Sequence, residues 1–199
     1  CCFYDEGGFG VEKDKRKAIH YYKKAADLGN AKAQLNLGLM YQKGIGCEVD
    51  KEKAKEYFKM ASDQGNDQAQ LSLALLLLEG EKPEKIEALK LLKSSANLGN
   101  PAAMFYLARR YQQNNDMNKA IDYFSRASRA NYFYAQLELG KIYLKGENGI
   151  QKDLQKAEYF LKEAASHNVK EALIYLSYLH KNKPNDHPIK IIFNFLESK

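Results

Sequence analysis

The side chains that most often carry out catalysis or bind metals are few in this chain, and they do not cluster in the sequence. The histidines and cysteines are His20, His167, His180 and His187, and Cys1, Cys2 and Cys47. A nucleophile with its base, or the His and Cys ligands of a zinc site, would need a spacing that these residues lack. The sequence therefore predicts no catalytic site, no metal and no cofactor.

Two further patterns are explained more simply by structure than by chemistry. Glycine-rich stretches occur at residues 7–10, 44–46 and 146–149. A phosphate-binding loop would need a preceding strand and a following lysine and hydroxyl residue, so we interpret these stretches as turns. Three cysteines, two of them adjacent, are a poor basis for a disulfide framework. Free thiols favour the cytoplasm, and a secreted or periplasmic parent protein stays open.

The composition predicts a folded chain without membrane insertion. Of the 199 residues, 45% are hydrophobic and only four are proline, which is enough apolar surface to offset the loss of chain entropy. The longest apolar run, residues 73–78, is far too short to span a bilayer. The formal net charge is +6, and residues 101–199 carry most of it, with 15 basic and 10 acidic residues. Such a surplus is typical of solvated helix surfaces and of proteins with acidic partners.

An internal repeat of 32 to 37 residues organises the chain. Its clearest marker is a glycine or asparagine, here named the terminator, at Gly29, Gly65, Gly99, Asn131 and Asn168. Counted from each terminator, position 4 is always alanine, position 8 is always leucine, and position 12 is tyrosine in three of the five copies. Because positions 4, 8 and 12 share one helical face, we expect a first helix after every terminator.

A second helix is expected before every terminator. Pairs of small residues seven apart, such as Ala54 and Ala61, enclose a bulky pair such as Tyr57 and Phe58. The small residues allow helices to approach closely, and the bulky pair fills the space between them. Aspartate stands four residues before the first alanine in four copies, at Asp14, Asp50, Asp116 and Asp153. We expect these aspartates to cap helix starts, and the terminators to end helices in the left-handed conformation.

These motifs resemble the Sel1-like repeat, a branch of the tetratricopeptide-type helical solenoids. Residues 33–54 follow the family pattern almost literally, apart from Cys47 where the family usually has valine, and residues 11–26 match its second half. The resemblance covers residues 1–182. It implies an all-α fold, a right-handed α-solenoid of helix-turn-helix repeats. Such solenoids are scaffolds whose function lies in variable surface positions.

The terminators set the expected boundaries. We expect a partial repeat at 1–30, repeats at 31–66, 67–100, 101–131 and 132–168, and a last first helix at 169–182. Residues 183–199 are expected to form a degenerate capping helix with Asp186 at the N-cap. Its apolar residues, Ile189 to Leu196, either close the core or meet another chain.

The resemblance further implies that the first helices line a concave groove for a partner. Positions 10 and 14 should then face the groove. Position 10 holds Leu39, Leu75, Arg109, Lys141 and Tyr178, and position 14 holds Lys43, Glu79, Gln113, Lys145 and Asn182. Arg109, Lys141 and Lys145 suit an acidic or phosphorylated peptide, while Tyr134 and Tyr178 offer flat contact area.

Position 6 is apolar in every copy, and we expect it to pack in the core rather than to contact a ligand. It holds Leu35, Leu71, Phe105, Leu137 and Ile174.

The leading hypothesis is a non-enzymatic adaptor that binds a partner protein or an acidic peptide, with a bacterial host-interaction factor as one form of that role. A regulatory arm of a larger enzyme or complex is an open alternative, because the chain begins at Cys1 within an expected helix. RNA-binding helical repeats need recurring polar residues at fixed positions. Position 10 varies from leucine to arginine to tyrosine, so we expect no nucleic-acid partner.

Overall fold

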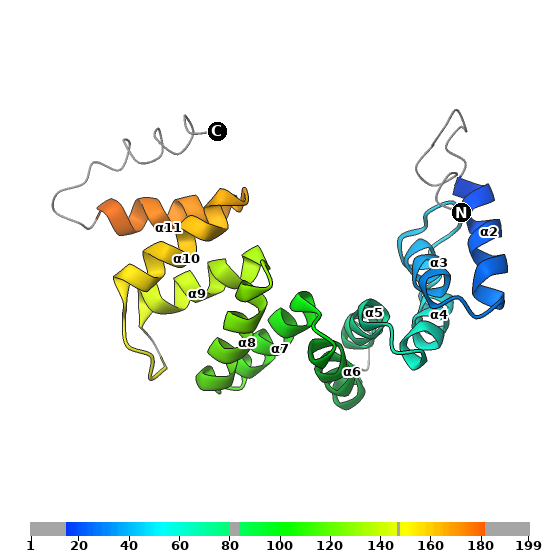
Figure 1. Cartoon of the computed structure of the whole chain (residues 1–199), viewed down its shortest axis with the longest axis horizontal. Coiled ribbons are helices and arrows are strands. Elements are labelled where there is room, and N and C mark those ends of the chain that lie inside the picture. Colours follow the sequence, from blue (N-terminus) through cyan, green and yellow to red (C-terminus); the bar gives the residue numbers. More distant parts are fainter. Residues whose placement is uncertain (1–14, 80–83, 147, 182–199) are drawn as a thin grey trace. The chain divides into compact units, whose positions relative to one another are not determined.

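The computed structural model describes residues 15–79, 84–146 and 148–181, and these ranges are entirely helical and loop in character. Within them lie ten α-helices and no β-strand (Figure 1). The helices are α2 (Lys15–Asp27), α3 (Ala31–Lys43), α4 (Lys51–Asp63), α5 (Asp67–Glu79), α6 (Lys85–Asn97), α7 (Pro101–Gln113), α8 (Met117–Arg129), α9 (Phe133–Lys145), α10 (Leu154–Ser166) and α11 (Lys170–Lys181). The predicted alternation of first and second helices is confirmed.

The chain divides into two compact units, residues 1–103 and 104–199. In the first unit, α2 packs against α3, α3 against α4, α4 against α5, and α5 against α6. In the second unit, α8, α9, α10 and α11 pack in the same sequential way, and α9 also touches α11. Rings join α7 to α8, where Phe105 lies 5.7 Å from Phe124. Packing between sequential neighbours is the hallmark of a helical repeat array.

The expected helix starts are present wherever the structure describes them. Asp50, Asp116 and Asp153 each accept a hydrogen bond from the backbone N–H three residues later, at 3.0, 3.2 and 2.9 Å. Asp14 lies outside the described residues. A further set of caps escaped the sequence analysis: Asn30, Asn66 and Asn100, each directly after a terminator, cap the first helices in the same way. Side-chain caps thus fix the starts of α3, α4, α5, α7, α8 and α10, whereas Glu84 before α6 and Tyr132 before α9 form no such hydrogen bond.

The five terminators all adopt the left-handed conformation, with φ between 58° and 96°. Glycine enters this region freely and asparagine tolerates it, which is why these two residue types occupy the position. The backbone turns sharply there, so three residues separate the end of each second helix from the start of the next first helix.

The core of each repeat is built from the recurring alanines and leucines. All five alanines of position 4 and all five leucines of position 8 are buried, namely Ala33, Ala69, Ala103, Ala135 and Ala172, and Leu37, Leu73, Leu107, Leu139 and Leu176. The second residue of each bulky pair is also buried, as with Phe58 and Phe124. At position 9, an added Cβ on Gly38 would lie 2.6 Å from the Phe58 ring. Glycine there lets paired helices approach closely.

The expectation for position 6 holds in four copies and is wrong for Ile174. Leu35, Leu71, Phe105 and Leu137 are at most 8% exposed, whereas Ile174 is 68% exposed. In the copy that begins at α7, Phe105 at this position meets the second helix of its own repeat and the start of the next one, 5.7 Å from Phe124 and 5.2 Å from Tyr132.

Candidate functional site

In the first unit, the predicted groove positions are two leucines at position 10 and two charged residues at position 14. Leu39 and Leu75 are half-buried, so they add to the packing of α3 and α5 as much as to the surface. Lys43 and Glu79 are exposed at position 14. Glu79 forms an ion pair with Lys51 at 3.5 Å, which links the end of α5 to the start of α4. At position 10 this unit therefore offers a partner two half-buried leucines and no charge.

In the second unit, Arg109 on α7 is exposed, and its guanidinium lies 6.0 Å from the centre of the Phe105 ring. That distance is within the range of a cation–π contact, which holds the long side chain over an aromatic support. Across residues 15–79, 84–146 and 148–181, no carboxylate forms an ion pair with Arg109. Its positive charge is thus available to an external anion.

The Phe105 ring beneath Arg109 belongs to a cluster of aromatic residues, Phe105, Tyr106, Tyr132 and Tyr134, which we call the aromatic cluster. The ring of Phe105 lies 5.6 Å from that of Tyr106 and 5.2 Å from that of Tyr132. The ring of Tyr132 in turn lies 5.8 Å from that of Tyr134, which is 56% exposed. Tyrosines of this kind contribute large rigid contact area with a hydroxyl at the edge.

The pKa of Tyr132, the half-buried tyrosine of the aromatic cluster, is affected by its neighbours in the cluster. Burial raises the pKa of Tyr132, and the nearby phenol groups of Tyr106 and Tyr134 raise it further. The raised pKa keeps the Tyr132 hydroxyl protonated at neutral pH, so it remains a hydrogen-bond donor. Sequence reasoning predicted Tyr134 but missed Tyr106 and Tyr132. One signal was present: Tyr132 stands directly after a terminator, where three other copies carry a capping asparagine.

Lys141 on α9 was expected to bind a partner, but the carboxylates it meets belong to this chain. Its Nζ lies 2.9 Å from Glu138 Oε1 and 3.4 Å from Glu171 Oε1, and 5.6 Å from the Tyr175 ring. Burial alone would lower the pKa of Lys141, but the hydrogen bond and charge of Glu138, with Glu171 and Tyr175, outweigh burial and raise the pKa. Lys141 thus ties α9 to α11, and its charge is largely compensated.

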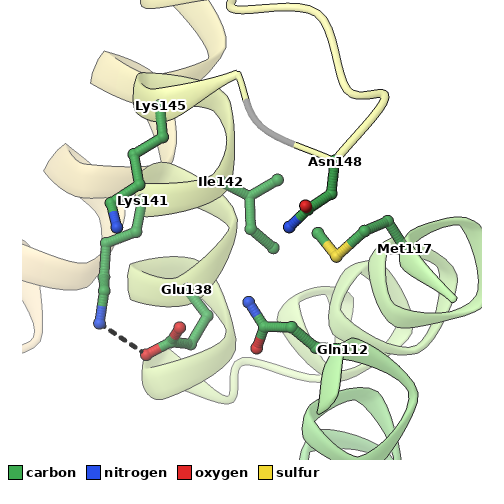
Figure 2. Close-up of a pocket in the computed structure, with 7 residues that line it drawn as sticks. All are labelled: Gln112, Met117, Glu138, Lys141, Ile142, Lys145 and Asn148. Atoms are coloured by element: carbon green, nitrogen blue, oxygen red, sulfur yellow. Dashed lines mark hydrogen bonds and ion pairs between the residues drawn. The ribbon is translucent and has the colours of Figure 1, made fainter. Parts of the chain in front are cut away.

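Lys145, one turn after Lys141, lies on the edge of a small pocket in the second unit. The pocket has a volume of about 90 Å³ and is lined by Gln112, Met117, Glu138, Lys141, Ile142, Lys145 and Asn148. Figure 2 shows Gln112, Met117, Ile142 and Asn148 facing one another, with the dashed ion pair of Lys141 and Glu138 beside them. The lining combines the apolar side chains of Met117 and Ile142 with the amides of Gln112 and Asn148.

The predicted site residues thus separate into three places rather than forming one basic groove. Tyr134 belongs to the aromatic cluster at α7 and the start of α9, and Arg109 lies over the Phe105 ring of that cluster. Lys141 and Lys145 lie at the pocket on α9. Tyr178 is 61% exposed on α11, on the same helix as the exposed Ile174.

Chemistry other than binding finds no support in the described ranges. There, no three His, Cys, Asp or Glu side chains come together as a metal would require. Burial raises the pKa of the Cys47 thiol, which disfavours the thiolate needed by a nucleophile. No helix of the described residues is long and apolar enough to cross a bilayer.

Comparison with known proteins decides the family. The Sel1 repeat model matches residues 1–30, 31–66, 67–100, 101–132 and 133–169. The chain belongs to the Sel1 repeat family. The predicted resemblance and the all-α solenoid fold of helix-turn-helix repeats are therefore confirmed. A comparison with curated proteins returned no significant match.

Solved Sel1 structures support the same assignment. A Sel1 repeat protein from Oxalobacter formigenes is 31% identical, with a TM-score of 0.85, over 100% of this chain and 85% of its own. Immunity protein Pa5087 from Pseudomonas aeruginosa is 26% identical, with a TM-score of 0.64, over 94% of this chain and 72% of its own. The protective antigen c5321 of uropathogenic Escherichia coli, which displays the same type of fold, is 26% identical, with a TM-score of 0.56, over 90% of this chain and 47% of its own. These bacterial neighbours point to a bacterial origin, and Sel1 repeat proteins are generally protein-interaction scaffolds.

Proposed function

We propose that this chain is a non-enzymatic scaffold that binds an acidic segment of a partner protein at Arg109 and the aromatic cluster. The observation that carries the proposal is the guanidinium of Arg109, which pairs with no carboxylate of the described residues and lies over Phe105. Ring contacts through Tyr132 connect Phe105 to the exposed Tyr134. Tyrosine and arginine are the residues most enriched among those that dominate binding energy at interfaces. Membership of a family of interaction scaffolds adds to this support.

The acidic character of the partner follows from the charges on this face. Arginine presents a planar fork of donors that matches a carboxylate, and the Phe105 ring beneath Arg109 holds that fork at the surface. Lys145 is exposed on the next first helix and offers a second positive charge at the pocket. Lys141 is left out of the proposed contact, because Glu138 and Glu171 already occupy its ammonium group.

Binding of defined peptides tests this proposal directly. We would present the full chain with two pools of fluorescent peptides of equal length and aromatic content, one rich in Asp and Glu and one with Asn and Gln in their place. The wild-type chain should retain acidic peptides, and Arg109→Glu with Tyr134→Ala should weaken their binding by at least about thirtyfold, the range of a hot-spot truncation of about 2 kcal/mol.

The matched control is Lys43→Glu, at position 14 of the first unit, which should leave acidic-peptide binding unchanged. Equal retention of both pools, or equal loss in both variants, would overturn the assignment to Arg109 and the aromatic cluster. A single-stranded RNA that displaces the acidic peptides would favour the RNA-binding alternative instead. Sequencing the retained peptides would give the acidic spacing that identifies a natural partner.

A narrower role is favoured by the likeness to Pa5087, whose printed name is immunity protein. In that role this chain would bind one dedicated protein and block its action. A dedicated partner should remain bound in stoichiometric amount through size-exclusion chromatography of the native complex. A regulatory arm of a larger enzyme would instead be recognised by a change in that enzyme's activity when Arg109 is substituted.

A further inference from the structure

The pocket of the second unit stands at repeat positions where the first unit carries an ion pair. In the first unit, Lys51, directly after the N-cap of α4, pairs with Glu79 at position 14 of α5, at 3.5 Å. The residues at the same two places in the second unit are Met117, directly after the N-cap of α8, and Lys145 at position 14 of α9. The second unit has thus exchanged the carboxylate for a cation and the cation for a neutral thioether.

Lys145 therefore has no counter-charge of the kind that Lys51 has. It is exposed, and no carboxylate of the described ranges forms an ion pair with it. The two other charged residues of the pocket, Lys141 and Glu138, pair with each other at 2.9 Å. The lining as a whole holds one more cation than anions, so its charge favours an anion from outside the chain.

The pocket beside Lys145 has the size and the polar groups to receive a carboxylate. Its volume of about 90 Å³ is room for several water molecules or for one short side chain. The amides of Gln112 and Asn148 face one another across it (Figure 2), and no hydrogen bond within the described ranges uses either amide. A side-chain amide carries two N–H donors that carboxylate oxygens accept. Met117 and Ile142, which are 6% and 7% exposed, offer apolar contact to methylene groups.

We propose that this pocket binds the carboxylate side chain of an aspartate or glutamate in a partner protein. The carboxylate pairs with the ammonium group of Lys145 and accepts hydrogen bonds from the amides of Gln112 and Asn148. It takes the place that Glu79 has within the first unit.

The inference rests on the proposed function, because it gives the acidic segment a second point of attachment. Gln112 stands three residues after Arg109 on α7, so the two side chains are neighbours on one face of the helix. One segment with two acidic residues can therefore contact Arg109 with the first and enter the pocket with the second.

Methyl NMR of the full chain tests the pocket, because Met117 lines it. The chain has four methionines, and labelling their methyl groups with carbon-13 gives a small set of signals from which Met117→Leu identifies the one in the pocket. The probes are a peptide of alternating Glu and Ser and a matched peptide of alternating Gln and Ser. The glutamate peptide should shift the Met117 signal, and the glutamine peptide should leave it in place.

Two charge reversals at position 14 provide the matched variants. Lys145→Glu gives α9 the charge that Glu79 gives α5, and it should weaken binding of the glutamate peptide at least about tenfold and remove the shift of the Met117 signal. Lys43→Glu makes the same change on α3, and both the affinity and the shift should stay as in the wild type.

Each outcome decides for or against the pocket. An unmoved Met117 signal together with an affinity that Lys145→Glu leaves unchanged would overturn it, and the proposed function would then stand alone if Arg109→Glu still weakens the peptide. An effect of Lys145→Glu without an effect of Arg109→Glu would keep the pocket and refute the proposed function. A glutamate peptide that does not bind would refute both. Inorganic phosphate that shifts the Met117 signal and displaces the peptide would assign the pocket to phosphate groups instead of carboxylates.

Discussion

Position 10 of the first helices holds half-buried leucines in the first unit, Leu39 and Leu75, whereas the second unit places Arg109, Lys141 and Tyr178 there. In the first unit, Glu79 at position 14 pairs with Lys51 of α4 at 3.5 Å. The second unit pairs Lys141 with Glu138 and Glu171 but leaves Arg109, which lies over the Phe105 ring, without a carboxylate in the described ranges. The same repeat framework thus carries leucines at position 10 in one unit and charged or aromatic residues in the other.

The difference teaches which positions of the repeat are available to function. Positions 4, 8 and the second bulky residue are buried in both units, so they are needed for packing and cannot vary in chemistry. Positions 10 and 14 lie at the helix surface, where a change of residue costs little stability. Function in this chain is therefore expected to differ between the units while their cores behave alike.

The largest expected effect tests that similarity of the cores. Phe58→Ala in the first unit and Phe124→Ala in the second should each lower the free energy of unfolding by about 3–5 kcal/mol, because both rings are completely buried and each leaves a large cavity. Urea unfolding followed by circular dichroism measures this. The exposed Ile86→Ala serves as control and should change stability by less than about 0.5 kcal/mol. A loss confined to one unit would show that the two cores are not equivalent.

The next effect separates the two lysines of α9. Lys141→Glu brings a third carboxylate to Glu138 and Glu171 and removes their shared cation, so we expect a loss of about 1–3 kcal/mol in unfolding free energy. Lys145→Glu, at an exposed site, should stay within about 0.5 kcal/mol. Parallel urea titrations give both values. Equal losses would mean that the ion pairs of Lys141 do not hold α9 to α11.

The smallest effect concerns the helix caps, which the two units share. The pKa of Asp50 and of Asp116 is lowered first by the side chains of Lys53 and Lys119 and then by their backbone N–H groups, and the pKa of Asp153 first by the backbone N–H of Lys156. Because each pKa is lower in the folded chain, the carboxylates stabilise it above the unfolded value of about 3.9 and lose this contribution as the pH falls through the folded values.

Replacing all three aspartates by asparagine keeps the caps but removes their charge. The wild type should therefore exceed this triple variant in urea midpoint at pH 7, and the two midpoints should converge at pH 2. Single substitutions at Asp50 and Asp116 should give similar changes, because each carboxylate pairs with the side chain and the backbone N–H of a lysine three residues later. A pH-independent difference between wild type and variant would contradict a role for the carboxylate charge.

Much of the fold could be predicted because the same residue pattern recurs in five copies of the repeat. Aspartate caps, left-handed terminators and buried alanines act through the backbone and through nearest neighbours, so local spacing is enough to place them. The asparagine caps were not predicted, because only three of the five terminators are followed by asparagine, and the other two are followed by tyrosine and valine. Ile174 was misplaced because its burial depends on a neighbouring repeat rather than on its own helix.

The candidate site was predicted less completely. Arg109 and Tyr134 were selected by position, and the structure brings both to the aromatic cluster. Tyr132 was not selected, because its contact with Phe105 joins the start of α9 to α7. Tyr106, the neighbour of Phe105 on α7, was not selected because it stands at neither position 10 nor position 14. The pairing of Lys141 with Glu138 could be suspected from their spacing of three residues on one helix, but Glu171 lies 30 residues away.

By itself, the sequence determined the family, the all-α repeat, the helix ends and the buried stripe, because each depends on interactions between residues within one turn of helix or within one repeat. Only the tertiary structure decided which surface charges are already paired and which rings contact Phe105, the ring beneath Arg109. Those outcomes depend on how tightly adjacent first helices approach and on the direction of long side chains across that contact. A linear pattern records neither of these quantities, since residues such as Lys141 and Glu171 become neighbours only after the repeats stack.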